Sequence, residues 1–257
     1  MSHYIVANTA AEAWTRAIGD LLAAPSHELI NLSVAIRKPK EPVSDVTRAI
    51  DDFLSAEQQR HPKERVYGVA TVANTIFPTA LYRPGTPNAE TRFYEATARV
   101  LRRRKRIAPR ERSYFRRLVA YAGASGASIN QLQRVVRQLR EANQRGDSNG
   151  SLYELAFFDA KSDARPQGFP CLSHVSLSLV ESRIHMAALY RNHYFLRRAY
   201  GNYLGLADLL QFIANESGFA MGEILCVSSH AKLDGGVAVV RDLHAECVAA
   251  LGRLEAA

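Results

Sequence analysis

Apolar residues alternate with small or polar residues between positions 172 and 190, and this is the clearest pattern in the chain. The apolar positions of its two halves are Leu172, Val175, Leu177 and Leu179, then Ile184, Met186, Ala188 and Tyr190. Alternation of this kind is typical of half-buried strands. With Glu181 and Ser182 as a tight connection, the pattern predicts a β-hairpin that begins just after Cys171.

Helical spacing follows the hairpin. Between Asn202 and Gly218, apolar residues recur at positions 203, 206, 209, 210 and 213, and the glycine falls where a helix would stop. A strand is predicted next, over Glu223–Ser228.

The rest of the chain also divides into helical and extended patterns. Thr9 and Glu12 fit a capping box at the start of a helix that would end near Ala24, before Pro25. Further helices are predicted over 45–58, 88–105, 109–121 and 237–254, and strands over 29–36 and 66–72. No linker divides this series, so we expect one α/β (α+β) domain over residues 1–257.

The order Pro-Cys, hairpin, Asn-bearing helix, Gly-Glu and strand resembles the thymidylate synthase superfamily, which includes the pyrimidine hydroxymethylases. Residues 128–139 resemble the family helix that comes before the double-arginine strand, and residues 152–158 lie where that strand would be, so the resemblance implies a helix and a strand there. The resemblance covers 112–234 well and 1–111 loosely. It implies a mixed sheet flanked by helices and a homodimer formed through the sheet face, for which strands 29–36 and 172–190 would supply apolar surface.

Cys171 is the nucleophile that the resemblance implies. In the family this thiolate adds to C6 of a pyrimidine, and C5 then attacks a one-carbon unit from a reduced folate such as 5,10-methylenetetrahydrofolate. A thiolate needs a neighbour that lowers its pKa. Gly168-Phe169-Pro170 precedes the cysteine as in the family, and His174 points to the opposite strand face. The alternative is a buried cysteine at the start of a strand.

Three further residues match positions that bind the pyrimidine nucleotide or nucleoside in the family. Arg191 corresponds to a phosphate-binding arginine, or is a solvated residue at a strand end. Asn202 corresponds to the amide that reads the pyrimidine edge, where family members acting on cytosine use an acid; it therefore favours a uracil-type ring, or is simply a helix N-cap. Arg65 corresponds to a phosphate arginine on a mobile loop.

The remaining candidates are less direct matches. Glu95 corresponds to a carboxylate that manages protons around the base, or is a solvated helical residue. His230 and Lys232 lie where the family holds the ribose, and would serve a sugar or an anion. Arg197 and Arg198 are further phosphate candidates.

The chain departs from the family in several places. The two adjacent arginines that open the family's 152–158 strand are absent, Leu172 replaces a histidine, and the family's closing C-terminal strands correspond to one helix. A relative that keeps thiol addition on a different substrate, or one that has lost catalysis, is therefore favoured over ordinary thymidylate synthase.

Composition and charge add one feature. The formal charge is +8, but Arg99–Arg117 alone contributes +9, so the rest of the chain sums to −1. This basic stretch is a solvated helix end, a set of phosphate ligands over the site, or a nucleic-acid surface, although it lacks interleaved aromatic residues in 102–106. Cys171, Cys226 and Cys247 lack metal-ligand spacing, and the last two are expected to be packing residues.

No apolar run spans a bilayer and no leader pattern opens the chain, so we expect a cytoplasmic protein with no membrane association. Two main functions remain open. One is a diverged one-carbon transferase that uses Cys171 to act on a uracil-type nucleotide or nucleoside. The other is an altered or inactive member that binds a nucleotide or nucleic acid through the basic stretch. A cysteine enzyme acting on an unrelated small electrophile is a third alternative.

Overall fold

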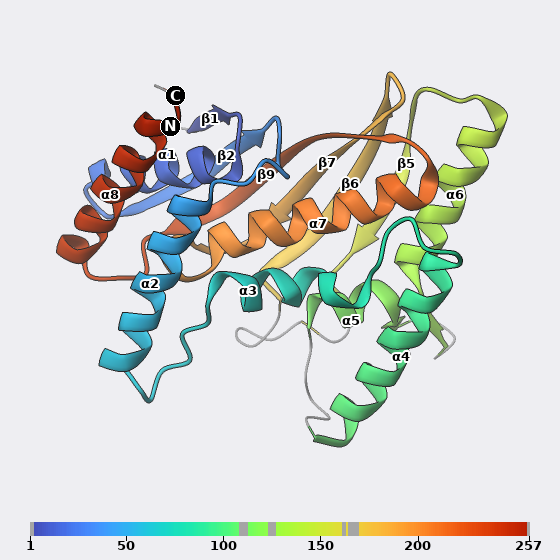
Figure 1. Cartoon of the computed structure of the whole chain (residues 1–257), viewed down its shortest axis with the longest axis horizontal. Coiled ribbons are helices and arrows are strands. Elements are labelled where there is room, and N and C mark those ends of the chain that lie inside the picture. The colour runs from blue at the N-terminus through green and yellow to red at the C-terminus, as the bar shows by residue number, and fades with distance from the viewer. Residues whose placement is uncertain (1–2, 108–112, 123–126, 161–162, 164–169, 256–257) are drawn as a thin grey trace. The chain divides into compact units, whose positions relative to one another are not determined.

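The computed structural model describes residues 3–107, 113–122, 127–160, 163 and 170–255 (Figure 1). Its strands form a mixed sheet in the order β1-β2-β9-β7-β6-β5, with β8 paired to β9, and helices accompany them. The predicted mixed α/β class is confirmed.

The chain divides into two compact units. Unit 1 consists of Met1–Ala73, Ala187–Ala207 and Glu223–Ala257, and unit 2 consists of Asn74–Met186 and Asp208–Gly222. The boundaries fall inside α3, β7, α7 and β9, so these four elements contribute residues to both units.

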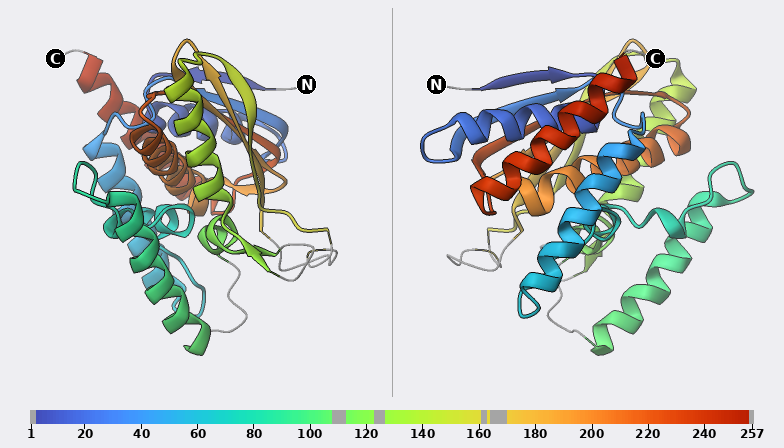
Figure 2. Two further views of the ribbon diagram at one scale, coloured as in Figure 1. Left: turned by 90° about the vertical axis from the view of Figure 1, so that its right-hand side faces the viewer. Right: turned by 60° about the vertical axis from the view of Figure 1, so that its left-hand side comes forward.

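Three strand pairings organise unit 1. β1 (Tyr4–Ala7) runs parallel to β2 (Glu28–Ile36), β2 runs antiparallel to β9 (Ala220–Lys232), and β8 (His193–Tyr194) runs parallel to β9. Helix α1 (Ala10–Ala23) packs on β1 and β2, and α8 (Val237–Glu255) lies against α1 and α2 (Ser44–Arg60) (Figure 2). Trp14 of α1 is fully buried, and its indole N–H donates to the Phe195 carbonyl at 2.7 Å.

The start of α1 follows the capping-box prediction. The Thr9 hydroxyl accepts a hydrogen bond from the Glu12 amide at 3.1 Å, and the Glu12 carboxylate accepts one from the Asn8 amide at 2.7 Å. Two of the first amides of this region are thereby satisfied by side chains. The Glu12 carboxylate reaches one residue further back than in the standard box.

Unit 2 combines a strand pair with helices. β5 (Gly150–Ala156) runs antiparallel to β6 (Leu172–Val180), and α6 (Gln131–Arg145) packs on β5. The unit also contains η1 (Thr79–Leu81), α4 (Ala89–Ile107), α5 (Tyr114–Val119) and the short pair β3 (Tyr121–Ala122) and β4 (Ser128–Ile129). Its aromatic core brings together Phe77, Tyr82, Phe93, Phe115 and Phe212.

The predicted hairpin forms between β6 and β7 (Arg183–Tyr190). Glu181 and Ser182 both have positive φ, 48° and 59°, as a tight two-residue hairpin turn requires. The predicted helix after the hairpin is also confirmed: α7 (Tyr200–Ser217) ends at Gly218, whose φ is +81°. A π-helical turn, η2 (Phe195–Ala199), leads into it.

Two local predictions were wrong. Residues 66–72 were expected to be a strand, but α3 (Val69–Ile76) is a helix. The Asp51 side chain accepts a hydrogen bond from the Val69 amide at 2.7 Å, so a residue of α2 satisfies the first amide of α3. The helix expected from Pro109 begins instead at Tyr114, with the Ser113 hydroxyl as its cap, and Pro109 lies outside the described residues.

Replacing Asp51 by Ala should lower the free energy of unfolding by about 1 kcal/mol, because the α3 start loses its acceptor. The control is Asp52→Ala, which removes an exposed neighbouring carboxylate with the same charge. Urea unfolding followed by circular dichroism measures both variants. Equal stability of the two variants would contradict a capping role for Asp51.

Candidate functional site

The predicted site residues are divided between the two units. Cys171 and Glu95 belong to unit 2. Unit 1 contains Arg65, Arg191, Asn202, His230 and Lys232.

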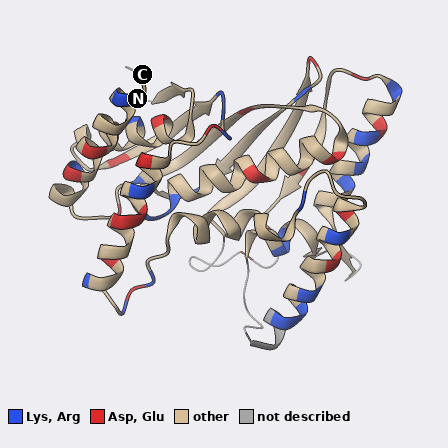
Figure 3. Ribbon diagram, in the orientation of Figure 1, with Lys and Arg blue, Asp and Glu red and all other residues tan. Residues whose placement is uncertain are grey.

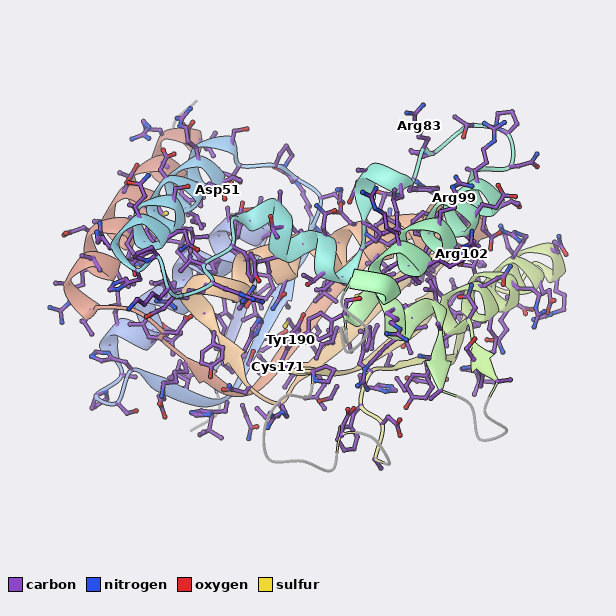
Figure 4. The ribbon with its side chains drawn as sticks, turned by 90° about the horizontal axis from the view of Figure 1, so that it is seen from below. Asp51, Arg83, Arg99, Arg102, Cys171 and Tyr190 are labelled. Atoms are coloured by element: carbon purple, nitrogen blue, oxygen red, sulfur yellow. The ribbon has the colours of Figure 1, made fainter. Side chains whose placement is uncertain are left out.

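Cys171 directly precedes β6 and is half-buried (Figure 4). The next residue, Leu172, donates its amide to the Tyr114 hydroxyl at 3.4 Å, which ties the strand start to α5. The other two thiols differ: burial raises the pKa of Cys247 to about 12 and that of Cys226 further still. Of the three cysteines, Cys171 is therefore the one whose side chain is not fully buried. Residues 168–169 of the preceding loop lie outside the described residues.

Glu95 lies on the exposed side of α4. Arg92 and Arg99 stand three and four residues away, on the same face of this helix. Within the described residues Glu95 makes no hydrogen bond or ion pair. In this chain Glu95 is therefore a solvent-exposed carboxylate.

His230 and Lys232 are brought together by a residue that the sequence analysis missed. In the β2–β9 register Glu28 faces Lys232 and Ile30 faces His230, so all four side chains emerge on one face. One Glu28 carboxylate oxygen accepts a hydrogen bond from His230 Nε2 at 2.9 Å, and the other accepts one from Lys232 Nζ at 2.8 Å. The Lys232 ammonium lowers the pKa of Glu28, and the carboxylate raises the pKa of Lys232.

This pairing changes what the two residues can bind. Glu28 offsets the charge of Lys232, so the cluster is a poor anion site but offers both donors and acceptors. Sugar hydroxyl groups, which donate and accept, suit it better than a phosphate. No local motif identifies Glu28, because it lies about 200 residues away from its partners in the sequence; the separation from His230 is 202.

Asn202 is the third residue of α7 and is buried, so helix capping does not account for it. Its side-chain Nδ2 lies 3.0 Å from Nε2 of His193, and Nδ1 of His193 lies 2.9 Å from the Ser228 hydroxyl. The Tyr190 ring stacks on the imidazole with centroids 4.1 Å apart and planes within 3°. Burial lowers the pKa of His193 to about 3, so the ring is neutral at physiological pH. No local pattern in the sequence points to His193.

The arginine candidates around η2 have different environments. Arg191 and Arg65 are both exposed, the first directly after β7 and the second in the connection between α2 and α3. Arg197 instead binds Glu64 at 2.5 Å, and Arg198 lies over the Tyr67 ring, 4.9 Å from its centroid. Arg197 and Arg198 therefore hold the connection that contains Arg65, and are less available to a phosphate than predicted.

The basic stretch is not uniform either. Arg117 forms a bidentate ion pair with the buried Asp163 and also donates to the Phe157 carbonyl, so it is a structural residue. Arg102 and Arg103 are exposed on α4. The side chains of Arg104–Arg106 and all of Arg110 and Arg112 lie outside the described residues.

The described ranges contain no cluster of metal-ligand residues and no candidate membrane span. They contain no group of three or more His, Cys, Asp or Glu side chains arranged to hold a metal ion. None of their helices combines the length and apolar character of a membrane span.

The buried neutral imidazole predicts a pH effect on stability. Because the folded-state pKa of His193 lies near 3 and the unfolded value near 6.5, the unfolded chain binds a proton that the folded chain does not. The contribution of the neutral His193 ring to the free energy of unfolding is fully present above pH 6.5. It falls by about 2 kcal/mol as the pH is lowered from 6.5 to 5. Denaturant unfolding at several pH values should show this slope reduced in His193→Gln and retained in the exposed control His61→Gln. Equal slopes would contradict the assignment.

Comparison with known proteins gives limited similarity. No family model matches the chain. A protein named "Putative thymidylate synthase" from Methanothermobacter marburgensis is 27% identical over 120 residues, which cover 46% of this chain and 49% of that protein. The match thus spans about half the length of that relative. It supports a thymidylate synthase-like relationship, in agreement with the resemblance drawn from the Pro-Cys hairpin.

Proposed function

We propose that the protein is a thymidylate synthase-like transferase in which Cys171 activates C5 of a uracil-type nucleotide or nucleoside. The observation that carries the proposal is the contrast among the thiols: Cys171 is accessible at a strand start, whereas Cys226 and Cys247 are buried. In this reaction the thiolate would add to C6, C5 would become a carbon nucleophile, and C5 would take up a one-carbon unit at the oxidation level of formaldehyde. Water would convert this unit to a hydroxymethyl group, or a hydride supplied by the reduced folate would convert it to a methyl group. Loss of the C5 proton then releases the thiolate from C6.

The other candidate residues take binding roles in this proposal. The exposed guanidinium groups of Arg65 and Arg191 bind the substrate phosphate. The Asn202 amide reads the pyrimidine edge. His230 and Lys232, held by Glu28, bind sugar hydroxyl groups. Glu95 manages the proton that leaves C5.

The carbon donor in this proposal is a reduced folate, 5,10-methylenetetrahydrofolate, which supplies the one-carbon unit when bound. Its glutamate carboxylates would need cationic partners other than Arg65 and Arg191, which bind the substrate phosphate in this proposal. We further propose a homodimer and a cytoplasmic location, both of which follow from the resemblance and the composition.

Covalent trapping tests the proposal. A 5-fluoropyrimidine nucleotide has no C5 proton to lose, so with methylenetetrahydrofolate it should remain attached to Cys171 and raise the protein mass by one nucleotide plus one folate. Mass spectrometry of the intact denatured protein should show this adduct in the wild type and none in Cys171→Ser.

The control for trapping is Cys247→Ala, which removes a buried thiol and should leave the adduct intact. An adduct that persists in Cys171→Ser would assign the chemistry to another group. Absence of an adduct with both uracil-type and cytosine-type fluorinated nucleotides would overturn the proposal.

A second candidate function is nucleic-acid binding, and one specific observation favours it. Four arginines of α4, Arg92, Arg99, Arg102 and Arg103, are exposed and form no ion pair within the described residues; we call them the arginine strip. At 3.6 residues per turn they fall within about 100° of the helix circumference and extend over about 16 Å. Figure 3, in which lysine and arginine residues are blue, shows such residues along both α4 and α6. On α6, by contrast, Arg140 and Arg145 pair with carboxylates.

The arginine strip would contact successive backbone phosphates, because the described strip has no aromatic side chain among its cations for base stacking. Replacing Arg99 and Arg102 by Gln should weaken duplex DNA binding about tenfold at moderate salt and reduce the slope of log affinity against log salt by about two. Figure 4 labels both residues on α4. Fluorescence anisotropy over a salt series measures both quantities.

The charge-matched control replaces Arg137 and Arg145 on α6, which pair with Glu141 and Asp147. It removes the same charge from the same unit and should change binding little. Equal losses in the two double variants would show that net charge, and not the arginine strip, determines binding.

A further inference from the structure

Helix α5 contacts the start of β6 directly after Cys171. The Leu172 amide donates to the Tyr114 hydroxyl at 3.4 Å. The next carbonyl along β6, that of Ser173, accepts a hydrogen bond from the Phe157 amide at 3.0 Å. The two residues that follow Cys171 are therefore held by α5 and by the residue that follows β5.

Arg117, which lies one turn after Tyr114 on α5, holds the same Phe157 from its carbonyl side. The Arg117 guanidinium donates to this carbonyl at 2.5 Å and forms two hydrogen bonds with the Asp163 carboxylate, at 2.5 and 2.7 Å. The Asp163 carboxylate also accepts from the Asp159 amide at 2.9 Å. Phe157 thus connects Arg117 to the β6 backbone two residues after the thiol.

Burial makes this arrangement difficult to replace. The Arg117 side chain is 11% exposed, the Asp163 side chain is fully buried, and so is Phe157. Little water reaches these groups, so solvent cannot easily take the place of a lost partner. A planar guanidinium can bind a carboxylate through two nitrogens while it also donates to a carbonyl, whereas a lysine ammonium has no such fixed fork.

The ion pair between Arg117 and Asp163 carries no net charge. Arg117 is therefore not a cation offered to a substrate, although it belongs to the basic stretch of the sequence. Any effect that it has on Cys171 must come from the position of the backbone that it holds.

We propose that Arg117 is a positioning residue that fixes the Cys171 thiol for attack on C6, by holding Phe157 and, through it, the start of β6. The inference rests on the proposed function, in which Cys171 adds to the pyrimidine. In that step the thiolate sulfur forms a bond with C6, and the electron pair of the C5–C6 double bond moves to C5. Such an attack depends on geometry, and a displacement of about 1 Å can slow it about a hundredfold.

The kinetics of covalent trapping separate position from binding. The probe is 5-fluoro-2′-deoxyuridine 5′-monophosphate with methylenetetrahydrofolate, and mass spectrometry follows the adduct with time. In Arg117→Gln the saturating rate of adduct formation should fall about a hundredfold, because the fork is lost, whereas the half-saturating nucleotide concentration should change less than about threefold. Arg117→Lys keeps the charge without the fork, so its rate should also fall, by about tenfold or more.

The matched control for these variants is Arg134→Gln. It removes an exposed arginine of α6 in the same unit and should trap the nucleotide at the wild-type rate. Circular dichroism establishes that each variant is folded. If Arg117→Gln does not fold, Asp163→Asn takes its place, because it keeps the shape of the carboxylate and removes one of the two acceptors of the fork.

A small alkylating reagent tests whether the thiol itself is intact. Iodoacetamide approaches from solution and is not held in one orientation, so its rate of reaction with Cys171 should have the same pH profile in the wild type and in Arg117→Gln. If alkylation and trapping slowed equally, Arg117 would act on the reactivity of the thiol, and the positioning role would be overturned.

The remaining outcomes distinguish the inference from the function on which it rests. Trapping at the wild-type rate in Arg117→Gln or in Arg117→Lys would overturn the inference and leave the proposed function intact. A wild type that forms no adduct with any fluorinated pyrimidine nucleotide would overturn the proposed function, and the inference with it.

Discussion

The neutral His193 ring must satisfy both of its nitrogens without water, and unit 1 is arranged around this constraint. The ring lies beneath Tyr190 at the end of β7, it belongs to β8, and its two partners come from α7 and β9. Four elements therefore depend on one side chain. A buried histidine that lost either partner would leave a polar group unpaired in a medium of low dielectric constant, which is costly.

The same region shows how the structure distributes charge. Glu28 offsets Lys232 on the sheet face, and Glu64 binds Arg197 beside η2. Asp163 does the same for Arg117 in unit 2. Because of these ion pairs, the cationic side chains that the sequence offers as anion ligands make structural contacts within the chain. Arg65, Arg191 and the arginine strip are exposed, and in the proposed functions a phosphate would bind to them.

The chain resembles thymidylate synthases in the order of its structural elements more than in its charged residues. The cysteine, the hairpin and the asparagine helix are present in that order, and the similar region of the archaeal relative covers 46% of the chain. The adjacent arginines of the family are absent. In the proposed transferase function, the substrate would therefore carry less charge than an ordinary nucleotide, as a nucleoside does, or would be held by cations from other elements.

Much of the fold follows from local patterns in the sequence. Alternation predicted the β6–β7 hairpin, and Glu181 and Ser182 provide its turn, because side chains on a half-buried strand must alternate between solvent and core. Thr9 and Glu12 marked the start of α1, since capping is satisfied within four residues. Gly218 marked the end of α7 in the same local way.

The tertiary structure decided the features that depend on residues far apart in the chain. Residues 66–72 look like a strand, but Asp51, 18 residues before Val69, caps a helix there. The sequence alone determined the accessible cysteine's place before a strand and the asparagine's place on a helix. It could not determine that Glu28 joins His230 across 202 positions, or that Asn202 donates to a buried imidazole. Such contacts arise only when distant strands and helices pack, because no local spacing encodes them.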